Sequence, residues 1–224
     1  MKPKSIGIIG GAGPMAGAYL LERIFSIACK KYHCHKDSDF PQLHLLSFPF
    51  SEMLSPKMDE EQLQAELKSC LRQLRSQGAS VIAIACNTLH AFLDEQDLRE
   101  DFLHLPKTLG KYLSHETPPL VLCTSTSVQF GLHRRYFPCV YPDPSTQVQI
   151  DEIIDQILKE GKTLGVLQKL KELIQAQMPS TIILGCTELS LFYADIQEIG
   201  KHIVDPLEVV AHEILQKSFS KSKE

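Results

Sequence analysis

The sequence lacks a continuous apolar stretch of about 20 residues, the length that a membrane-spanning helix needs, so no membrane partner is expected. It also lacks an excess of positive charge, because 23 lysines and arginines stand against 27 acidic residues. A nucleic-acid partner is therefore disfavoured, since such proteins present a basic face. No Gly/Ser-rich linker divides the 224 residues, which suffice for one large domain or two small lobes with a real core.

The seven cysteines include no Cys-x-x-Cys pair, and their number is odd. The chain is also long enough to fold without stabilising disulfide bonds. Reduced thiols are the simpler interpretation, and they predict a cytoplasmic location. Cys29 and Cys70 stand at helical spacing among apolar residues, where they behave as small hydrophobic residues. The cysteines that carry chemistry must therefore be identified by their positions.

Strand and helix patterns alternate along the chain. Short apolar runs typical of buried strands occupy 5–9, 43–46, 80–85, 120–123, 181–184 and 203–204. Helices are expected over 14–32, from 60, over 88–95, after Ser127, along the apolar stripes of 150–158 and 166–174, over 187–193 and over 206–219. This order predicts an α/β fold in which mostly parallel sheets are flanked by helices.

We expect two lobes, because the chain crosses near Pro106 and again near Asp205. Lobe one would hold 1–105 and 206–224, and lobe two would hold 106–205. Ligands in such folds bind beyond the carboxyl ends of the strands, which places the active site in the interlobe cleft.

A cysteine follows each of two similar buried strands. Cys86 comes after the run 80–85, and Cys186 comes after 181–184, about half the chain further on. Each is followed by hydroxyl or amide residues that can cap a helix. We therefore expect one thiol from each lobe to face the other across the cleft.

Such a pair fits the inversion of a carbon acid, which needs a proton removed from one face and another returned to the opposite face. A thiol pKa of about 8.5, lowered at a helix N-terminus, would let one cysteine be a thiolate while the other stays protonated. The two then exchange roles with the direction of reaction. Asn87 and Thr187 offer side-chain donors to a substrate carboxylate, and the helix N-termini add free N–H groups.

Four segments together resemble the aspartate/glutamate racemase superfamily, most closely its aspartate racemase branch. They are 6–14 (IGIIGGAGP), 85–92 (ACNTLHAF), 185–189 (GCTEL) and 203–206 (IVDP). The resemblance implies two pseudo-symmetric lobes, amino-acid racemisation without pyridoxal phosphate or another cofactor, and a homodimer.

The resemblance also implies roles for individual residues. Cys86 and Cys186 match the catalytic acid and base. The matched substrate-binding positions are Asn87, Thr88 and Thr187, a hydroxyl-rich loop with Thr124 and Ser127, and pocket-lining Ala12 and Phe50.

The chain departs from the aspartate racemases in several places. The stretch 48–54 has no basic residue to hold a side-chain carboxylate, and Lys162 stands beside the position of a second family lysine. The loop 124–127 lacks a family glycine, and the short strand before Lys107 is expected to be missing. These changes weaken the prediction of aspartate as substrate, because an unpaired buried carboxylate is costly. A less acidic or larger amino acid is compatible with them.

Other activities compete with racemisation. The turn at Gly11, Gly13 and Ala16 loosely fits a dinucleotide fingerprint, but no acidic residue follows the second strand and Pro14 removes an N–H. A maleate-isomerase-like enzyme also uses two cysteines, and a catalytically weak amino-acid-binding protein would keep the same fold. Decarboxylases of this type generally need a single cysteine, so the pair argues against them.

Several motifs have simpler interpretations. Adjacent residues in 33–35 (HCH) do not easily bind one metal ion, so a solvated helix end is favoured and no metal is expected. His90 either tunes Cys86 or fills the core. Glu188 either polarises Cys186 or complements a helix dipole. Asp205 is expected to cap the last helix.

Overall fold

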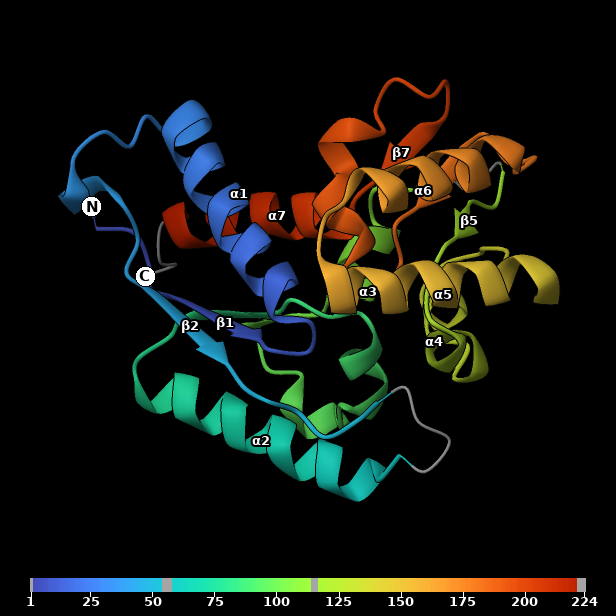
Figure 1. Ribbon diagram of the computed structural model, residues 1–224. Helices are drawn as coiled ribbons and strands as arrows, with labels where there is room; N and C mark the ends of the chain where they lie inside the picture. Colours follow the sequence, from blue (N-terminus) through green and yellow to red (C-terminus); the bar gives the residue numbers. More distant parts are fainter. Residues whose placement is uncertain (1, 54–57, 114–116, 221–224) are drawn as a thin grey trace.

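The computed structural model describes residues 2–53, 58–113 and 117–220. In this part of the chain, two parallel sheets are each flanked by helices, which confirms the expected α/β class (Figure 1). The strands are β1 Ile6–Gly10, β2 Leu43–Ser47, β3 Val81–Ile84, β4 Phe102–Leu103, β5 Leu120–Val121, β6 Thr181–Ile183 and β7 His202–Val204. The α-helices are α1 Pro14–Tyr32, α2 Glu60–Ser76, α3 Leu105–Gly110, α4 Ser125–Gln129, α5 Pro144–Glu160, α6 Leu164–Ala176 and α7 Pro206–Phe219. The 3₁₀ helices are η1 Asp37–Asp39, η2 Thr88–Phe92, η3 Glu95–Asp97, η4 His133–Arg135 and η5 Leu189–Asp195.

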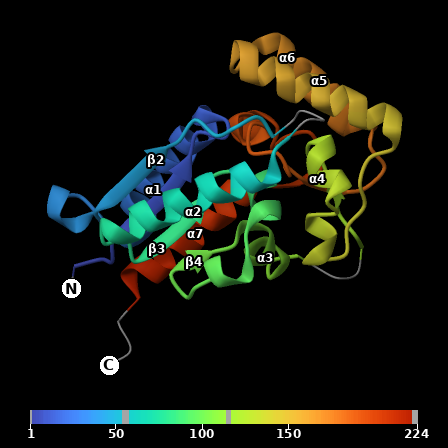
Figure 2. The same ribbon diagram turned by 90° about the horizontal axis from the view of Figure 1, so that it is seen from below.

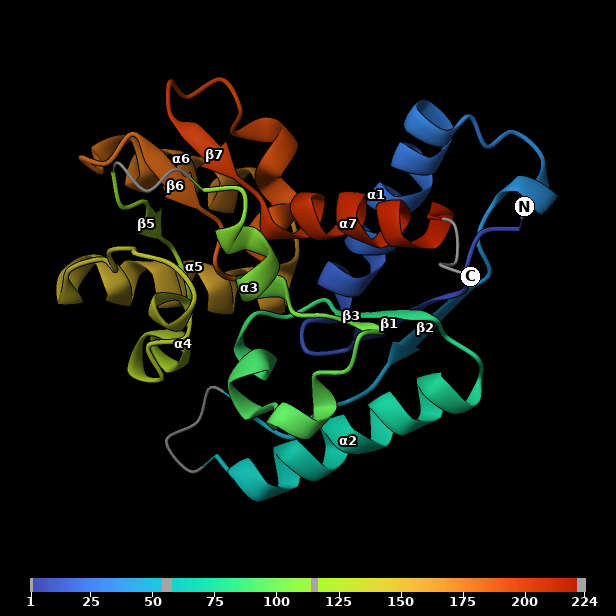
Figure 3. The same ribbon diagram turned by 180° about the vertical axis from the view of Figure 1, so that it is seen from behind.

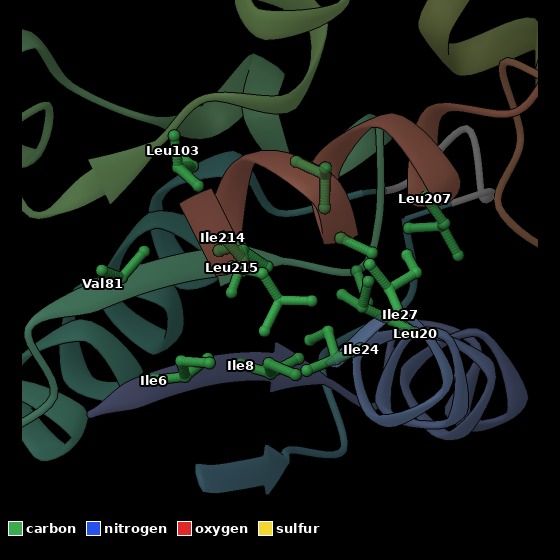
Figure 4. Packing of buried hydrophobic residues seen from close by; sticks show 14 of the residues in the cluster. Ile6, Ile8, Leu20, Ile24, Ile27, Val81, Leu103, Leu207, Ile214 and Leu215 are labelled. Atoms are coloured by element: carbon green, nitrogen blue, oxygen red, sulfur yellow. The ribbon is translucent and has the colours of Figure 1, made fainter. Parts of the chain in front are cut away.

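The first sheet has the order β2-β1-β3-β4, with all neighbours parallel. Helices α1 and α7 cover one face, and α2 covers the other (Figure 3). Successive side chains of β1 point to opposite faces. Ile6 and Ile8 therefore pack among apolar side chains of α1 and α7 (Figure 4). Ile9 packs with the apolar side chains of α2 on the other face. Burial on both faces explains the continuous apolar strand sequences.

The second sheet has the order β5-β6-β7, again parallel. Its core includes apolar stripes of α5 and α6, and these two helices lie side by side, apart from α2 and β2 (Figure 2). Val140 joins this sheet only through a single bridge to Leu120, because Pro142 follows within two residues.

The last helix returns to the first sheet. Helix α7 packs on α1, α3 and β3, and the backbone N–H of Lys4 donates to the carbonyl of Ser218 at 2.9 Å. The side chain of Asp205 accepts a hydrogen bond from the N–H of Leu207, which confirms Asp205 as the cap of α7. The lobe boundaries at 105/106 and 205/206 stay a proposal.

Two local expectations were wrong. Phe102 and Leu103 pair in parallel with β3 immediately before α3, so the strand ahead of Lys107 is present. This strand was missed because its two residues are too few to show an alternating apolar pattern in the sequence. Helix α4 begins at Ser125 rather than after Ser127, because the Thr124 hydroxyl accepts the N–H of Ser127 and caps the helix earlier. Among the described residues, no helix combines the length and apolarity needed to cross a membrane.

His133 makes the fold sensitive to acid. Its side chain is fully buried beside Phe137 and Tyr141, and neither ring nitrogen has a hydrogen-bond partner among the described residues. Burial lowers the pKa of His133 to about 4. An unfolded histidine has a pKa of about 6.5 and takes up its proton first as the pH falls.

His133 therefore contributes stability that is present above about pH 6.5 and is lost as the pH falls toward 4, about 3 kcal/mol for an isolated group. We expect His133→Phe to reduce the acid loss in the free energy of unfolding, measured by urea titration between pH 7.5 and 4. The same substitution at the exposed His35 is the control and should leave the loss unchanged. An unchanged pH slope in His133→Phe would contradict this account.

Candidate active site

Two thiols from different sheets line one small cavity. Cys86 follows β3 and Cys186 follows β6, and each side chain is 6% exposed. The cavity has a volume of about 60 Å³. Of the residues predicted from sequence, those that line it are Ala12, Cys86, Asn87, Thr88, Thr124, Cys186 and Thr187. The strand-end rule thus brings most of the predicted residues to one cavity, and their roles stay a proposal.

The remaining two predicted residues lie elsewhere. Phe50 lines a neighbouring cavity of about 600 Å³, which shares Ala12, Gly13 and several other lining residues with the small one. Ser127 lines neither cavity, and its hydroxyl lies 3.0 Å from that of Thr88. The small cavity is below the roughly 300–1,000 Å³ of ordinary ligand sites. An amino acid must therefore also occupy the larger cavity or separate the lobes.

Hydrogen bonds between segments of the two sheets hold the small cavity closed. The Thr187 hydroxyl donates to the carbonyl of Ala85 at 3.2 Å, and the Thr126 hydroxyl donates to the carbonyl of Met53 at 3.1 Å. Thr88 adds hydroxyl contacts to Thr124 at 3.3 Å and Ser127 at 3.0 Å, and each such bond is worth about 1 kcal/mol net. Substrate binding can therefore open and re-form this contact at modest cost.

The amide of Asn87 is a ready-made ligand contact. The side chain is 1% exposed, and neither its oxygen nor its nitrogen has a partner among the described residues. Buried polar groups are nearly always hydrogen-bonded, so such an amide keeps a donor and an acceptor available. It lines the thiol cavity, which places both groups beside any molecule bound there.

Both thiols are neutral in this closed site, contrary to the expectation of a lowered pKa. Burial, followed by the charge of Glu188, raises the pKa of Cys86 to about 12. Hydrogen bonds from the N–H groups of Leu89 and Thr88 act in the opposite direction but do not offset burial. Burial and Glu188 likewise hold the pKa of Cys186 well above its ordinary value. A thiolate therefore forms here only with help from a base or a substrate charge.

Glu188 lies where a base could accept the proton of Cys186. The Cys186 thiol donates to Glu188 Oε2 at 2.9 Å, and burial raises the pKa of the carboxyl group. Its other oxygen, Oε1, has no partner among the described residues. Of the two sequence interpretations, the contact with Cys186 is the one observed, because the side chain turns back to the thiol.

Gly13 leaves the space that Glu188 needs. Its φ is +79°, and a Cβ built there would lie 1.5 Å from Glu188 Oε1. Only glycine satisfies both conditions. A carboxyl group at this turn also repels a phosphate, which argues against the dinucleotide interpretation.

His90 is a core histidine that does not touch the thiol. Its Nδ1 lies 2.8 Å from the carbonyl of Cys86, and its Nε2 accepts the N–H of Leu105 at 3.1 Å. Nδ1 therefore carries the proton and donates to that carbonyl. Burial lowers the pKa of His90, which keeps the ring neutral.

Lys162 does not replace the missing family lysine. Its ammonium pairs with Asp195 at 2.6 Å, and it lines a separate cavity with Arg23 and Tyr193. In the described ranges, no group of three or more His, Cys, Asp or Glu residues is placed to hold a metal ion. Cys34 of the HCH motif is buried, and its thiol lies 3.4 Å from the carbonyl of Asp39.

The parallel sheets and the small cavity between strand ends define a two-lobed α/β protein with an enzyme-like site. The chain belongs to the Asp/Glu/Hydantoin racemase family, whose profile matches residues 9–214. It is 23% identical over 201 residues to the broad specificity amino-acid racemase RacX of Bacillus subtilis, covering 86% of this chain and 88% of the relative.

Two solved structures have the same fold. The aspartate racemase of Picrophilus torridus matches with a TM-score of 0.77 at 22% identity, over 98% of this chain and 96% of its own. An aspartate racemase homologue from Pyrococcus horikoshii matches with a TM-score of 0.74 at 22% identity, over 98% and 100%. The resemblance noted in the sequence is confirmed, and the chain is of a racemase family.

Proposed function

We propose that the protein is a cofactor-independent amino-acid racemase in which Cys86 and Cys186 are paired acid and base. One observation carries the proposal: thiols from two different sheets line the same cavity as the Asn87 amide, which has no hydrogen-bond partner in the described part of the chain. A pair of proton carriers brought from separate strand ends suits a carbon that must lose a proton on one face and gain one on the other. Family membership and the similarity to the amino-acid racemase RacX support the same reaction class.

The reaction begins with a proton transfer inside the protein. Cys186 gives its proton to the Glu188 carboxylate, to which it is already hydrogen-bonded, and becomes a thiolate. The positive α-ammonium group of the substrate stabilises this thiolate, because an opposite charge nearby favours the ionised form. The substrate thereby offsets the burial that keeps the free site neutral.

The thiolate then takes the α-proton, and the electron pair of the broken C–H bond stays on the α-carbon and delocalises into the substrate carboxylate. Asn87, Thr88 and Thr187 hold that carboxylate through N–H and O–H donors, which strengthen as its charge grows. Cys86 finally gives its proton to the opposite face of the carbon. The cysteines finish with exchanged protonation, ready for the reverse direction.

The proposal is tested by incubating each common amino acid, as a single enantiomer, with the protein and separating enantiomers by chiral chromatography. We expect at least one amino acid to reach an equal mixture. A protein that only binds amino acids would leave every sample unchanged and would overturn the proposal. The homodimer and the cytoplasmic location stay predictions.

A further inference from the structure

The larger cavity beside the thiols provides room for a substrate side chain. Its volume of about 600 Å³ exceeds that of the thiol cavity tenfold, and the two share Ala12, Gly13, Met53 and Thr124 among their lining residues. An amino acid whose α-carbon lies between the thiols therefore extends its side chain into this space.

Carboxylates predominate over cations among the described residues around that space. Glu52, Asp151 and Asp155 line the larger cavity, and Glu188 lines the smaller one. No lysine or arginine among the described residues lines either cavity. Lys159 pairs with Asp155 at 2.7 Å, and both side chains are mostly exposed, so this pair belongs to the solvent side of α5. Among the described residues, Glu52 and Asp151 are the lining carboxylates that make no ion pair.

Asp151 is fixed in position by the protein. It accepts the N–H of Ser125 at 3.0 Å and the side-chain amide of Gln147 at 3.2 Å. These are hydrogen bonds from neutral donors, so the negative charge of Asp151 is held in place and is not cancelled. A fixed charge at a cavity wall discriminates between ligands because it needs no reorganisation on binding.

Two buried groups with no partner show independently that the connected cavities are built for a ligand. The Asn87 amide and Glu188 Oε1 both line the thiol cavity, and neither has a hydrogen-bond partner among the described residues. A substrate main chain supplies both an acceptor for the amide N–H and an ammonium donor for Oε1. The acidic wall of the larger cavity is then left to the side chain.

From these observations we infer that the substrate carries a positively charged side chain, an ammonium or guanidinium group. This inference rests on the racemase function proposed above and names its substrate class. The charged groups among the described residues of this cavity are carboxylates, so an acidic side chain meets like charges, which disfavours binding, whereas a cation gains from the same carboxylates.

The inference is tested by comparing kcat/KM for L-lysine, L-norleucine and L-glutamate. Norleucine has the carbon chain of lysine without the ammonium group, so the pair isolates the charge. We expect lysine to exceed norleucine at least about 10-fold and glutamate to be the poorest, with the preference for lysine falling as salt is added.

Charge-neutralising variants locate the effect. Glu52→Gln and Asp151→Asn should each lower kcat/KM for lysine by about 3- to 10-fold and leave norleucine unchanged, a loss typical of one charge contact. The control is Glu152→Gln, on the same helix as Asp151 but lining a separate groove between α5 and α6, and it should change neither rate.

Faster turnover of glutamate or aspartate than of lysine would overturn the inference and leave the racemase function intact. Equal losses for lysine and norleucine in Glu52→Gln and Asp151→Asn would show a structural role for these carboxylates and would also overturn it. Absence of inversion for every amino acid would remove the proposed function itself.

Discussion

Replacing Cys86 or Cys186 by serine is expected to lower racemisation at least about 10³-fold, the upper range of what one general acid or base contributes. Serine nearly preserves the volume of the buried side chain, so packing around the 60 Å³ cavity is retained. A hydroxyl group with its far higher pKa cannot carry the α-proton at neutral pH. The measurement is the initial rate of inversion by chiral chromatography.

The control for this experiment is Cys29→Ser, because Cys29 is exposed and remote from both cavities. It should retain full activity. Each active-site variant also keeps one base, so it should still exchange the α-hydrogen of one enantiomer slowly with solvent, and the two variants should act on opposite enantiomers. Near-normal inversion by either variant would contradict the assignment of the thiols.

Glu188→Gln is expected to lower kcat/KM about 10²-fold by removing the acceptor of the Cys186 proton. The pH profile distinguishes this role from a merely structural one. In the proposed mechanism the wild type needs ionised Glu188. Burial raises the pKa of this carboxyl group, so we expect the rate to rise at a higher pH than the pKa of an ordinary glutamate would give.

In Glu188→Gln this rise in the rate should disappear. The rate should instead keep increasing above pH 9, because the Cys186 thiol must then lose its proton to solvent. Glu188→Asp should restore part of the activity at neutral pH. A loss of activity with an unchanged pH profile, and no rescue by aspartate, would contradict the role of Glu188 as a proton acceptor and indicate a structural role.

The sequence predicted those parts of the protein that local patterns encode. The buried strands before Cys86 and Cys186 are short and uniformly apolar, so their ends, and with them the thiols, could be placed at one cleft. Asn87 was found by the same argument, since it directly follows the first of these strands. Asp205 as the cap of α7 was likewise readable from local sequence.

Features that depend on contacts between distant segments could not be predicted. The fit of Glu188 against Gly13 joins opposite ends of the chain, and only the folded distance reveals why glycine is required. The raised pKa of Cys86 arises from burial between the lobes, which outweighs the local helix N-terminus that the sequence shows. The wall formed by Glu52 and Asp151 likewise combines a loop with a helix.

The account turns on two monoprotic thiols that act from opposite faces of one carbon. The most direct measurement is inversion of a single enantiomer in deuterated water, stopped early and analysed by mass spectrometry after chiral separation. In the paired mechanism, one thiol gives a solvent-derived deuteron to one face of the carbon, and the other thiol keeps the proton that it abstracted. We therefore expect the product enantiomer to be labelled at the α-carbon and the recovered starting enantiomer to be unlabelled. Deuterium appearing equally in both enantiomers, or a product that retains its original hydrogen, would mean a single base and would contradict the paired-cysteine mechanism.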